Sequence, residues 1–287
     1  MILPTVVVMV TIVAYPFGWL FGLSLFEYEL PQLIGTQPAE FVGLSHFREL
    51  FTDPFFWVVL ARTIGFMVAN VVSIMLLGLL FALLMRRVAR GVRLALLASL
   101  ILAWAIPWIV AVTIWEWMVD FKFGVLNYLL SYLPFVDLIH HNWFVNAWQG
   151  FFVIGIVVVW QAIPFVAITA HAGLTQVPRE LEEAARVDGA GAWQTFRNVT
   201  LPVLRPVLTI VAIFEIIWCF QVFNQIFVML DYNPRPAYQV FSTYAFQLAF
   251  GSSQYGMAGA VAVVMVVCLL VLTSFYIRRM MRIGEMS

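Results

Sequence analysis

Long apolar runs dominate the hydrophobic pattern of this chain, and each is long enough to cross a lipid bilayer. A transmembrane helix needs about 20 predominantly apolar residues, and the runs that meet this requirement span residues 2–26, 56–85, 94–119, 147–173, 207–230 and 256–277. Pro16 interrupts the first run, so we expect a kink at Tyr15-Pro16. The pattern predicts an all-α integral membrane protein with six transmembrane helices in a single domain, residues 1–287.

Composition supports the membrane assignment and excludes several other classes. The chain is 63% hydrophobic and 10% charged, with a mean hydropathy of +0.97, whereas soluble domains are about 25% charged. Cys219 and Cys268 lie inside apolar runs, which argues against a disulfide framework or a cysteine metal site. The formal net charge is zero, so there is no basic excess for binding nucleic acid.

One polar passage, residues 174–206, separates the fourth and fifth apolar runs. Pro178 suits the first turn of a helix, and Gly189 suits the position just past its end, where φ is commonly positive. Between them we expect about 11 helical residues, roughly 16 Å at 1.5 Å per residue. Glu182 and Arg186 are one turn apart and can form an ion pair. The passage therefore contains a short, charged helix outside the membrane.

A second helical pattern follows within the same passage. Trp193, Phe196 and Val199 recur every three residues, which predicts an amphipathic helix lying along the membrane surface. Pro202 and Pro206 then mark the entry to the fifth run.

The motifs of this passage resemble the EAA loop of ATP-binding cassette importer permeases. They are Glu183-Ala184-Ala185, Asp188-Gly189-Ala190 and Val199-Thr200-Leu201-Pro202, with Val199 where isoleucine is usual. The resemblance implies the six-helix, MetI-like permease fold and a short cytoplasmic coupling helix that docks on an ATPase subunit. The residues that it assigns to ATPase coupling are Glu182, Glu183, Ala184, Ala185, Arg186, Asp188, Gly189, Leu201 and Pro202.

A second resemblance concerns the loops on the opposite side of the membrane. Residues 41–47, FVGLSHF, and 53–57, DPFFW, look like the first outer loop of sugar-importer permeases of the maltose and glycerol-phosphate group, first-permease subtype. This implies a sugar, oligosaccharide or polyol derivative as cargo. After the fifth run, however, that subtype usually has a Gly-Gly-Pro turn, and here residues 231–236 read DYNPRP.

The resemblance also implies partners that this chain lacks within itself. They are a second, homologous permease forming a heterodimer, two ATPase subunits and an extracytoplasmic solute-binding protein. The sequence contains no G-x-x-x-x-G-K-[ST] phosphate loop, so ATP and Mg²⁺ are expected on the ATPase subunits. We therefore expect a transport subunit with no catalytic residues and no cofactor of its own.

Arginine placement predicts the orientation. Loops on the side of the polar passage hold Arg86, Arg87, Arg90, Arg93, Arg179, Arg186, Arg197, Arg205, Arg278, Arg279 and Arg282, and the opposite loops hold only Arg48, Lys122 and Arg235. By the positive-inside rule, the polar passage and both termini lie in the cytoplasm of a bacterial or archaeal cell, although no charge precedes the first run and Met1 need not be the true start.

Polar residues inside the runs are the candidates for a substrate pathway. Glu215, Trp218, Gln221 and Gln225 recur at helical spacing in the fifth run, and Trp160 and Gln161 lie in the fourth. A carboxylate, amides and aromatic rings suit sugar hydroxyls and sugar faces, since ionisable groups in membranes usually face a cavity. The alternative is hydrogen bonding between helices that stabilises the bundle. His140 and His141 near Asp137 do not have the spacing of a metal site.

Two other functional hypotheses remain open at this point. The same importer could carry an amino acid, peptide or ion, since permeases for those cargos share a looser form of the loop. A stand-alone secondary carrier would transport without ATP and would show internal repeats, of which the sequence has no convincing example.

Overall fold

The computed structural model of the protein describes residues 3–133 and 138–284, with side chains described as far as residue 278. Met1, Asp137 and the side chains of Arg279 and Arg282, which enter the predictions above, lie outside the described part. The described chain forms two compact units. Unit 1 comprises residues 3–65 and 234–278, and unit 2 comprises residues 66–133, 138–233 and 279–284.

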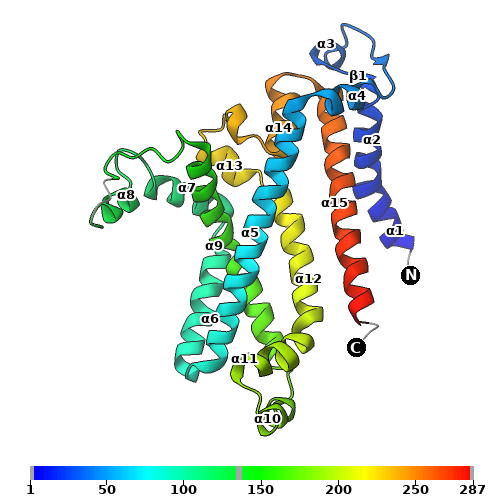
Figure 1. Cartoon of the computed structure of the whole chain (residues 1–287). Helices are drawn as coiled ribbons and strands as arrows, with labels where there is room; N and C mark the ends of the chain where they lie inside the picture. The colour runs from blue at the N-terminus through cyan, green and yellow to red at the C-terminus, as the bar shows by residue number, and fades with distance from the viewer. Residues whose placement is uncertain (1–2, 134–137, 285–287) are drawn as a thin grey trace. The chain divides into compact units, whose positions relative to one another are not determined.

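Unit 1 contains the first helices of the chain and most of its last helix (Figure 1). Its elements are α1 (Leu3–Met9), η1 (Val10–Ala14), α2 (Tyr15–Leu23), β1 (Phe26–Glu27), α3 (Leu30–Leu33), β2 (Glu40–Phe41), α4 (Ser45–Thr52), the first part of α5 (Pro54–Arg87), η3 (Pro236–Tyr238), α14 (Phe241–Phe246), η4 (Gln247–Gly251) and α15 (Tyr255–Gly284) as far as residue 278. The two short strands pair in antiparallel fashion, with Phe26 opposite Phe41 and Glu27 opposite Glu40.

Unit 2 contains the rest of α5 and the central helices. They are α6 (Arg90–Ala105), α7 (Trp108–Met118), α8 (Val125–Leu130), α9 (Ala147–Leu174), α10 (Arg179–Val187), α11 (Ala192–Thr195), η2 (Phe196–Thr200), α12 (Leu201–Phe220) and α13 (Asn224–Met229). Helix α9 packs against both α6 and α12. The short helices α10 and α11 lie together at one end of unit 2 (Figure 1).

Five helical stretches are long and apolar enough to span a membrane, and the number becomes six if a bent pair counts as one span. The five are Leu3–Leu23, Pro54–Arg87, Ala147–Leu174, Ala192–Met229 and Tyr255–Arg278, and the bent pair is Arg90–Ala105 with Trp108–Met118. The six predicted runs correspond to these stretches.

The third predicted span, residues 94–119, is a bent pair of helices and not one straight helix. The helix breaks between Ala105 and Trp108, and its two halves meet at 96°. Pro107 has no N–H to donate and disfavours helical dihedrals at the residue before it. Ile106 accordingly adopts φ −65° and ψ 126°, an extended conformation.

Pro16 is accommodated differently, inside a helical stretch that continues from Leu3 to Leu23. A wider turn over η1 precedes the proline, and the Tyr15 N–H bonds to the Val10 carbonyl, five residues back. Such wide turns release the backbone groups that a proline would otherwise leave in conflict.

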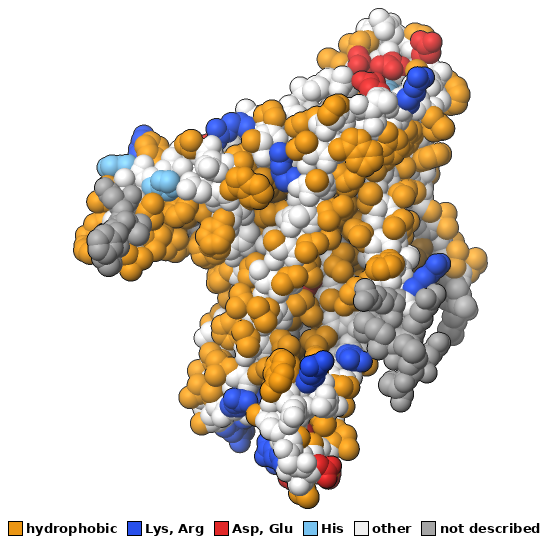
Figure 2. All heavy atoms as spheres, in the orientation of Figure 1, with side chains coloured by type: hydrophobic (Ala, Val, Ile, Leu, Met, Phe, Trp, Pro, Cys, Tyr) orange, Lys and Arg blue, Asp and Glu red, His pale blue; other side chains and the backbone are white. Residues whose placement is uncertain are grey.

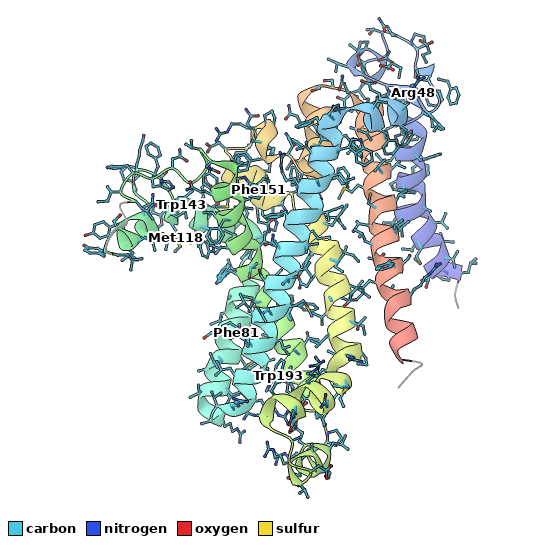
Figure 3. The ribbon with its side chains drawn as sticks, viewed as in Figure 1. Arg48, Phe81, Met118, Trp143, Phe151 and Trp193 are labelled. Carbon is cyan, nitrogen blue, oxygen red and sulfur yellow. The ribbon has the colours of Figure 1, made fainter. Side chains whose placement is uncertain are left out.

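The boundaries predicted for the fifth span, and the separate surface helix before it, are also wrong. The helix runs without interruption from Ala192 through η2 into α12 and passes both Pro202 and Pro206. The side chains buried in its first part are Thr195 and Thr200. Trp193, expected on the apolar face, is 69% exposed and lies at the α11 end of this helix (Figure 3). As before Pro16, a wider turn precedes the proline: in η2 the Leu201 N–H bonds to the Phe196 carbonyl, five residues back, and Pro202 follows directly.

Helices α5, α9 and α12 form the tightly packed part of unit 2. Ala82, Ala170, Leu174 and Leu204 make a fully buried cluster that joins the three helices. Farther along α9, Phe151 packs its ring against Phe66 of α5 at 5.3 Å between centroids (Figure 3). These contacts position the polar segment that connects α9 to α12.

Candidate functional site

Helix α10 is the helix predicted for the polar passage, and it is shorter than expected. It has nine residues, Arg179–Val187, and Pro178 precedes it in an extended conformation instead of lying in its first turn. Gly189 follows the helix with φ +84°, which confirms the expected left-handed residue at its end. Glu180 and Glu182 lie in the first turn and Arg186 in the last, as the helix dipole favours.

The spacing suggested that Glu182 pairs with Arg186, but in the structure its ion-pair partner is Arg86. Its two carboxylate oxygens each accept a hydrogen bond of 2.7 Å from Arg86, at the end of α5. The Thr200 hydroxyl donates a third bond of 2.9 Å. Arg86, 96 positions away in the chain, thus takes the place predicted for Arg186. Its guanidinium group is oriented so that two parallel N–H donors match the carboxylate.

These bonds determine the charge state of Glu182. Partial burial alone would raise the pKa of its carboxyl group, but the hydrogen bonds from Arg86 and Thr200 and the positive charges of Arg86 and Arg186 outweigh it. The pKa therefore lies below its usual value, and Glu182 is a carboxylate at neutral pH.

The remaining predicted coupling residues form an open surface on α10 and at the start of α12. Glu183, Ala184, Arg186, Asp188 and Gly189 are exposed, and Ala185, Leu201 and Pro202 are half-buried. Two exposed apolar residues of α10 were not among the predicted coupling residues, Leu181 at 49% and Val187 at 87%. With Ala184 they recur every three residues, a spacing that could have revealed them. Figure 2 shows hydrophobic side chains over the long helices and basic side chains around the end where α10 lies.

The structure separates most of the polar residues predicted to share one face of the fifth span. Helix α12 ends at Phe220, and α13 starts only at Asn224. Gln221 is therefore an exposed residue at the end of α12. Glu215 is fully buried, while Trp218 is 57% exposed. The prediction of one shared polar face is wrong, because α12 ends before Gln221 and Gln225 and because Glu215 is buried while Trp218, three residues on, is exposed.

A different set of residues comes together where α13 packs against α7 and α9. The Gln225 side chain donates to the Gln161 side-chain carbonyl at 2.9 Å, and the Trp160 ring packs against Trp115 at 6.0 Å. The carboxylates of Glu116 and Asp231 lie close enough to interact electrostatically. We call these six residues the polar–aromatic cluster. Trp115, Glu116 and Asp231 were not among the predicted pathway residues, because only the tertiary structure brings α7 beside α13.

Glu215 lies outside this cluster. Its side chain is 0% exposed, and neither carboxylate oxygen has a hydrogen-bond partner among the described residues. Burial of an unpaired carboxyl group is costly, so this residue destabilises the conformation seen here.

The turn after α13, where Gly-Gly-Pro was expected by resemblance, has an unusual backbone. Asp231 and Tyr232 adopt φ of +53° and +61°, a region that glycine enters at little cost. Their N–H groups bond to the Val228 and Phe227 carbonyls at 3.0 and 2.8 Å. The turn at Asp231 and Tyr232 therefore has a backbone conformation that glycine favours, although this chain lacks the Gly-Gly-Pro sequence usual in the subtype it resembles.

Histidines lie in two other regions of the chain, one in each unit. His140 and His141 bond to the Phe121 carbonyl and to the Gln149 side chain, each at 3.1 Å. In unit 1, a pocket of about 150 Å³ is lined by Glu27, Glu29, His46 and Glu49 among others. Among the described residues, no group of three or more candidate ligands could hold a metal ion.

Comparison with known proteins adds independent findings. The family described as binding-protein-dependent transport system inner membrane component matches residues 92–282. The diacetylchitobiose uptake system permease protein DasB of Streptomyces coelicolor is 36% identical, covering 99% of this chain and 87% of that protein. The trehalose/maltose transport system permease protein MalF of Thermococcus litoralis is 32% identical, covering 97% and 91%.

A solved structure supports the fold. A chain of a bacterial ABC transporter that imports the acidic polysaccharide alginate superposes with a TM-score of 0.80 at 23% identity, covering 99% of this chain and 94% of that one. The family match spans the passage that carries α10 and the EAA-like motifs. This chain belongs to the binding-protein-dependent transport system inner membrane component family, the permease subunits of ABC importers.

Proposed function

We propose that the protein is a permease subunit that forms half of the translocation pathway of an ATP-driven, binding-protein-dependent importer, and that the cargo is a sugar, oligosaccharide or polyol derivative. The observation that carries the proposal is α10. It is a charged nine-residue helix whose outer side is exposed and whose inner side is bonded to α5 and η2 through Glu182.

The exposed face of α10 is the surface on which an ATPase subunit docks. Leu181, Ala184 and Val187 supply an apolar stripe, and Glu183, Arg186 and Asp188 supply charges around it. Two ATPase subunits bind ATP and Mg²⁺ and, on closing, move α10 of this chain and the corresponding helix of a second, homologous permease. ATP can shift the inward–outward equilibrium only through its different affinity for the two states.

An extracytoplasmic binding protein delivers the solute at the opposite face. One of the alginate transporter structures of similar fold is a complex with a sugar-bound periplasmic protein. In this arrangement α10 and both termini are cytoplasmic, and the chain is a multi-pass protein of the bacterial or archaeal inner membrane.

The polar–aromatic cluster supports a sugar as cargo. Amide and carboxylate groups can hydrogen-bond hydroxyls, and tryptophan rings can cover the apolar face of a sugar ring. Relatives whose names specify diacetylchitobiose, trehalose or maltose, and sulfoquinovosyl glycerol agree with this class. We also include Glu215 and Gln221 in the candidate pathway. Glu215 is buried in this conformation, so it could contact the solute only after α12 moves.

Co-purification from the native membrane tests the coupling part of the proposal. We compare the wild type with Ala184→Arg plus Val187→Glu, and with Ser252→Arg, an exposed position outside α10, as the control. We expect an ATPase subunit and a second permease with the wild type and the control, and no ATPase with the double variant. A wild type that purifies alone and carries solute into liposomes without ATP would instead support a secondary carrier.

Uptake measurements test the cargo. Liposomes containing the purified complex and its binding protein are given labelled disaccharides, polyols, amino acids and peptides. We expect ATP-dependent uptake from the first two classes, and uptake of only amino acids or peptides would contradict the sugar assignment.

A further inference from the structure

The ion pair between Arg86 and Glu182 joins the coupling helix to a membrane-spanning helix. Nη1 and Nη2 of Arg86 each lie 2.7 Å from a carboxylate oxygen of Glu182, and the side chains of Arg86 and Glu182 are 31% and 13% exposed. Thr200 bonds to the same carboxylate, so α5, α10 and η2 meet at one group. We infer that Arg86 is a positioning residue through which α10 drives α5 during transport.

The need for such a link follows from how α10 is attached to the chain. On one side it connects to α9 through residues 175–178, and on the other to α11 through residues 188–191, which include Gly189 and Gly191. Gly189 is left-handed, with open space around it. A force applied to α10 through these connections alone would first bend them. The Arg86–Glu182 pair bypasses both connections.

The far side of the pair leads directly into the packed part of unit 2. Ala82 is one turn before Arg86 on α5 and belongs to the buried cluster with Ala170, Leu174 and Leu204. One turn further, Gly78 is in close contact with Val166 of α9. Close-packed interiors transmit displacement with little compression. A displacement of α10 that reaches Arg86 therefore moves α5, α9 and α12 together.

Arginine suits this position better than lysine. Its planar fork fixes both the distance and the orientation of the carboxylate, whereas an ammonium group makes a point contact on a flexible stem. The geometry predicts that the charge alone will not preserve the function of the link.

The inference rests on the proposed function, and its test measures solute transported per ATP hydrolysed in the reconstituted complex. The variants are Arg86→Gln, Arg86→Lys and the charge exchange Arg86→Glu with Glu182→Arg. The control is Arg87→Gln, because Arg87 is the exposed neighbour of Arg86. ATPase co-purification is measured for every variant.

We expect Arg86→Gln to keep its ATPase subunits, since the exposed face of α10 is unchanged. Its transport per ATP should fall roughly fivefold or more, the lower end of typical coupling between linked sites. Arg86→Lys should lie between Gln and wild type, the charge exchange should recover part of the loss, and Arg87→Gln should match the wild type.

Three results would overturn the inference. The first is an unchanged ratio of transport to ATP hydrolysis in Arg86→Gln. The second is loss of the ATPase subunits from Arg86→Gln, which would make the ion pair only an assembly contact. The third is no recovery of transport in the charge exchange. If Arg86→Gln does not accumulate in the membrane, recovery or non-recovery in the charge exchange decides alone. A wild type that needs no ATP would overturn the proposed function itself, which is a separate outcome.

Discussion

Gly78 of α5 and Val166 of α9 lie so close that a Cβ added to Gly78 would be 2.6 Å from two carbon atoms of the valine side chain. No larger residue fits there without moving one of the helices. Membrane helices commonly use small residues in this way, because close approach increases the van der Waals contact that holds them together.

Gly78→Val should therefore destabilise the protein. Overpacking of this kind typically costs about 1–3 kcal/mol, visible as a lower unfolding temperature in detergent. Gly65→Val is the matched control, because Gly65 is on the same helix and nothing lies within 4 Å of its added Cβ. Equal unfolding temperatures for the two variants would contradict the close crossing.

The end of α10 depends on backbone conformation at Gly189. Its φ of +84° is costly for side chains with a Cβ, by about 1–2 kcal/mol, although the space around it is open. We expect ATPase retention to fall in the order Gly, Asn, Ala, Val at this position. Gly191→Ala should have little effect, since Gly191 has φ −69°. If ATPase retention instead fell with side-chain volume, so that Asn was worse than Ala, the cause would be contact with a partner and not backbone conformation.

Acid should weaken the attachment of α10 through Glu182. The pKa of this carboxyl is lowered in the folded protein from the usual value of 4.5. Its contribution to stability is therefore present above about pH 4.5 and is lost as the pH falls through the lower, folded value. We expect the difference in unfolding temperature between wild type and Glu182→Gln to be constant at neutral pH and to shrink below pH 4.5. A difference that grows on acidification would mean that the sign of the shift is wrong.

Glu215 should show opposite effects on stability and on transport. Its buried carboxyl has no hydrogen-bond partner among the described residues, a situation that costs about 1–3 kcal/mol. Glu215→Leu should unfold at a higher temperature than the wild type while its ATP-dependent uptake falls. Uptake at wild-type levels would remove Glu215 from the substrate pathway.

Membrane orientation can be measured by labelling single cysteines in intact cells. Val187→Cys on α10 and Ser252→Cys in unit 1 are both exposed, and Cys219 and Cys268 are first replaced by alanine. A membrane-impermeant maleimide should label Ser252→Cys from outside and should reach Val187→Cys only after the cells are opened. The reverse pattern would invert the proposed topology.

Sequence patterns located the membrane spans and the coupling helix because both depend on local physics. A run of about 20 apolar residues partitions into the bilayer whatever it packs against, and a helix ends at a glycine such as Gly189 by its own backbone preference. Pro107 lies inside the third apolar run, but neither the break there nor its angle was predicted, since a proline alone does not determine how two helical halves are oriented.

The partners of the polar residues were decided only by the tertiary structure. Spacing on one helix predicted that Arg186 pairs with Glu182. Arg86 binds this carboxylate instead, because α5 ends beside α10 and its last turn carries a group with two donors. Likewise Gln225 meets Gln161 because α12 stops at Phe220 and the chain turns α13 toward α9. The sequence by itself determined which segments lie in the membrane and which short helix lies outside it. Contacts between residues far apart in the chain depend on how helices pack, and no local periodicity encodes that.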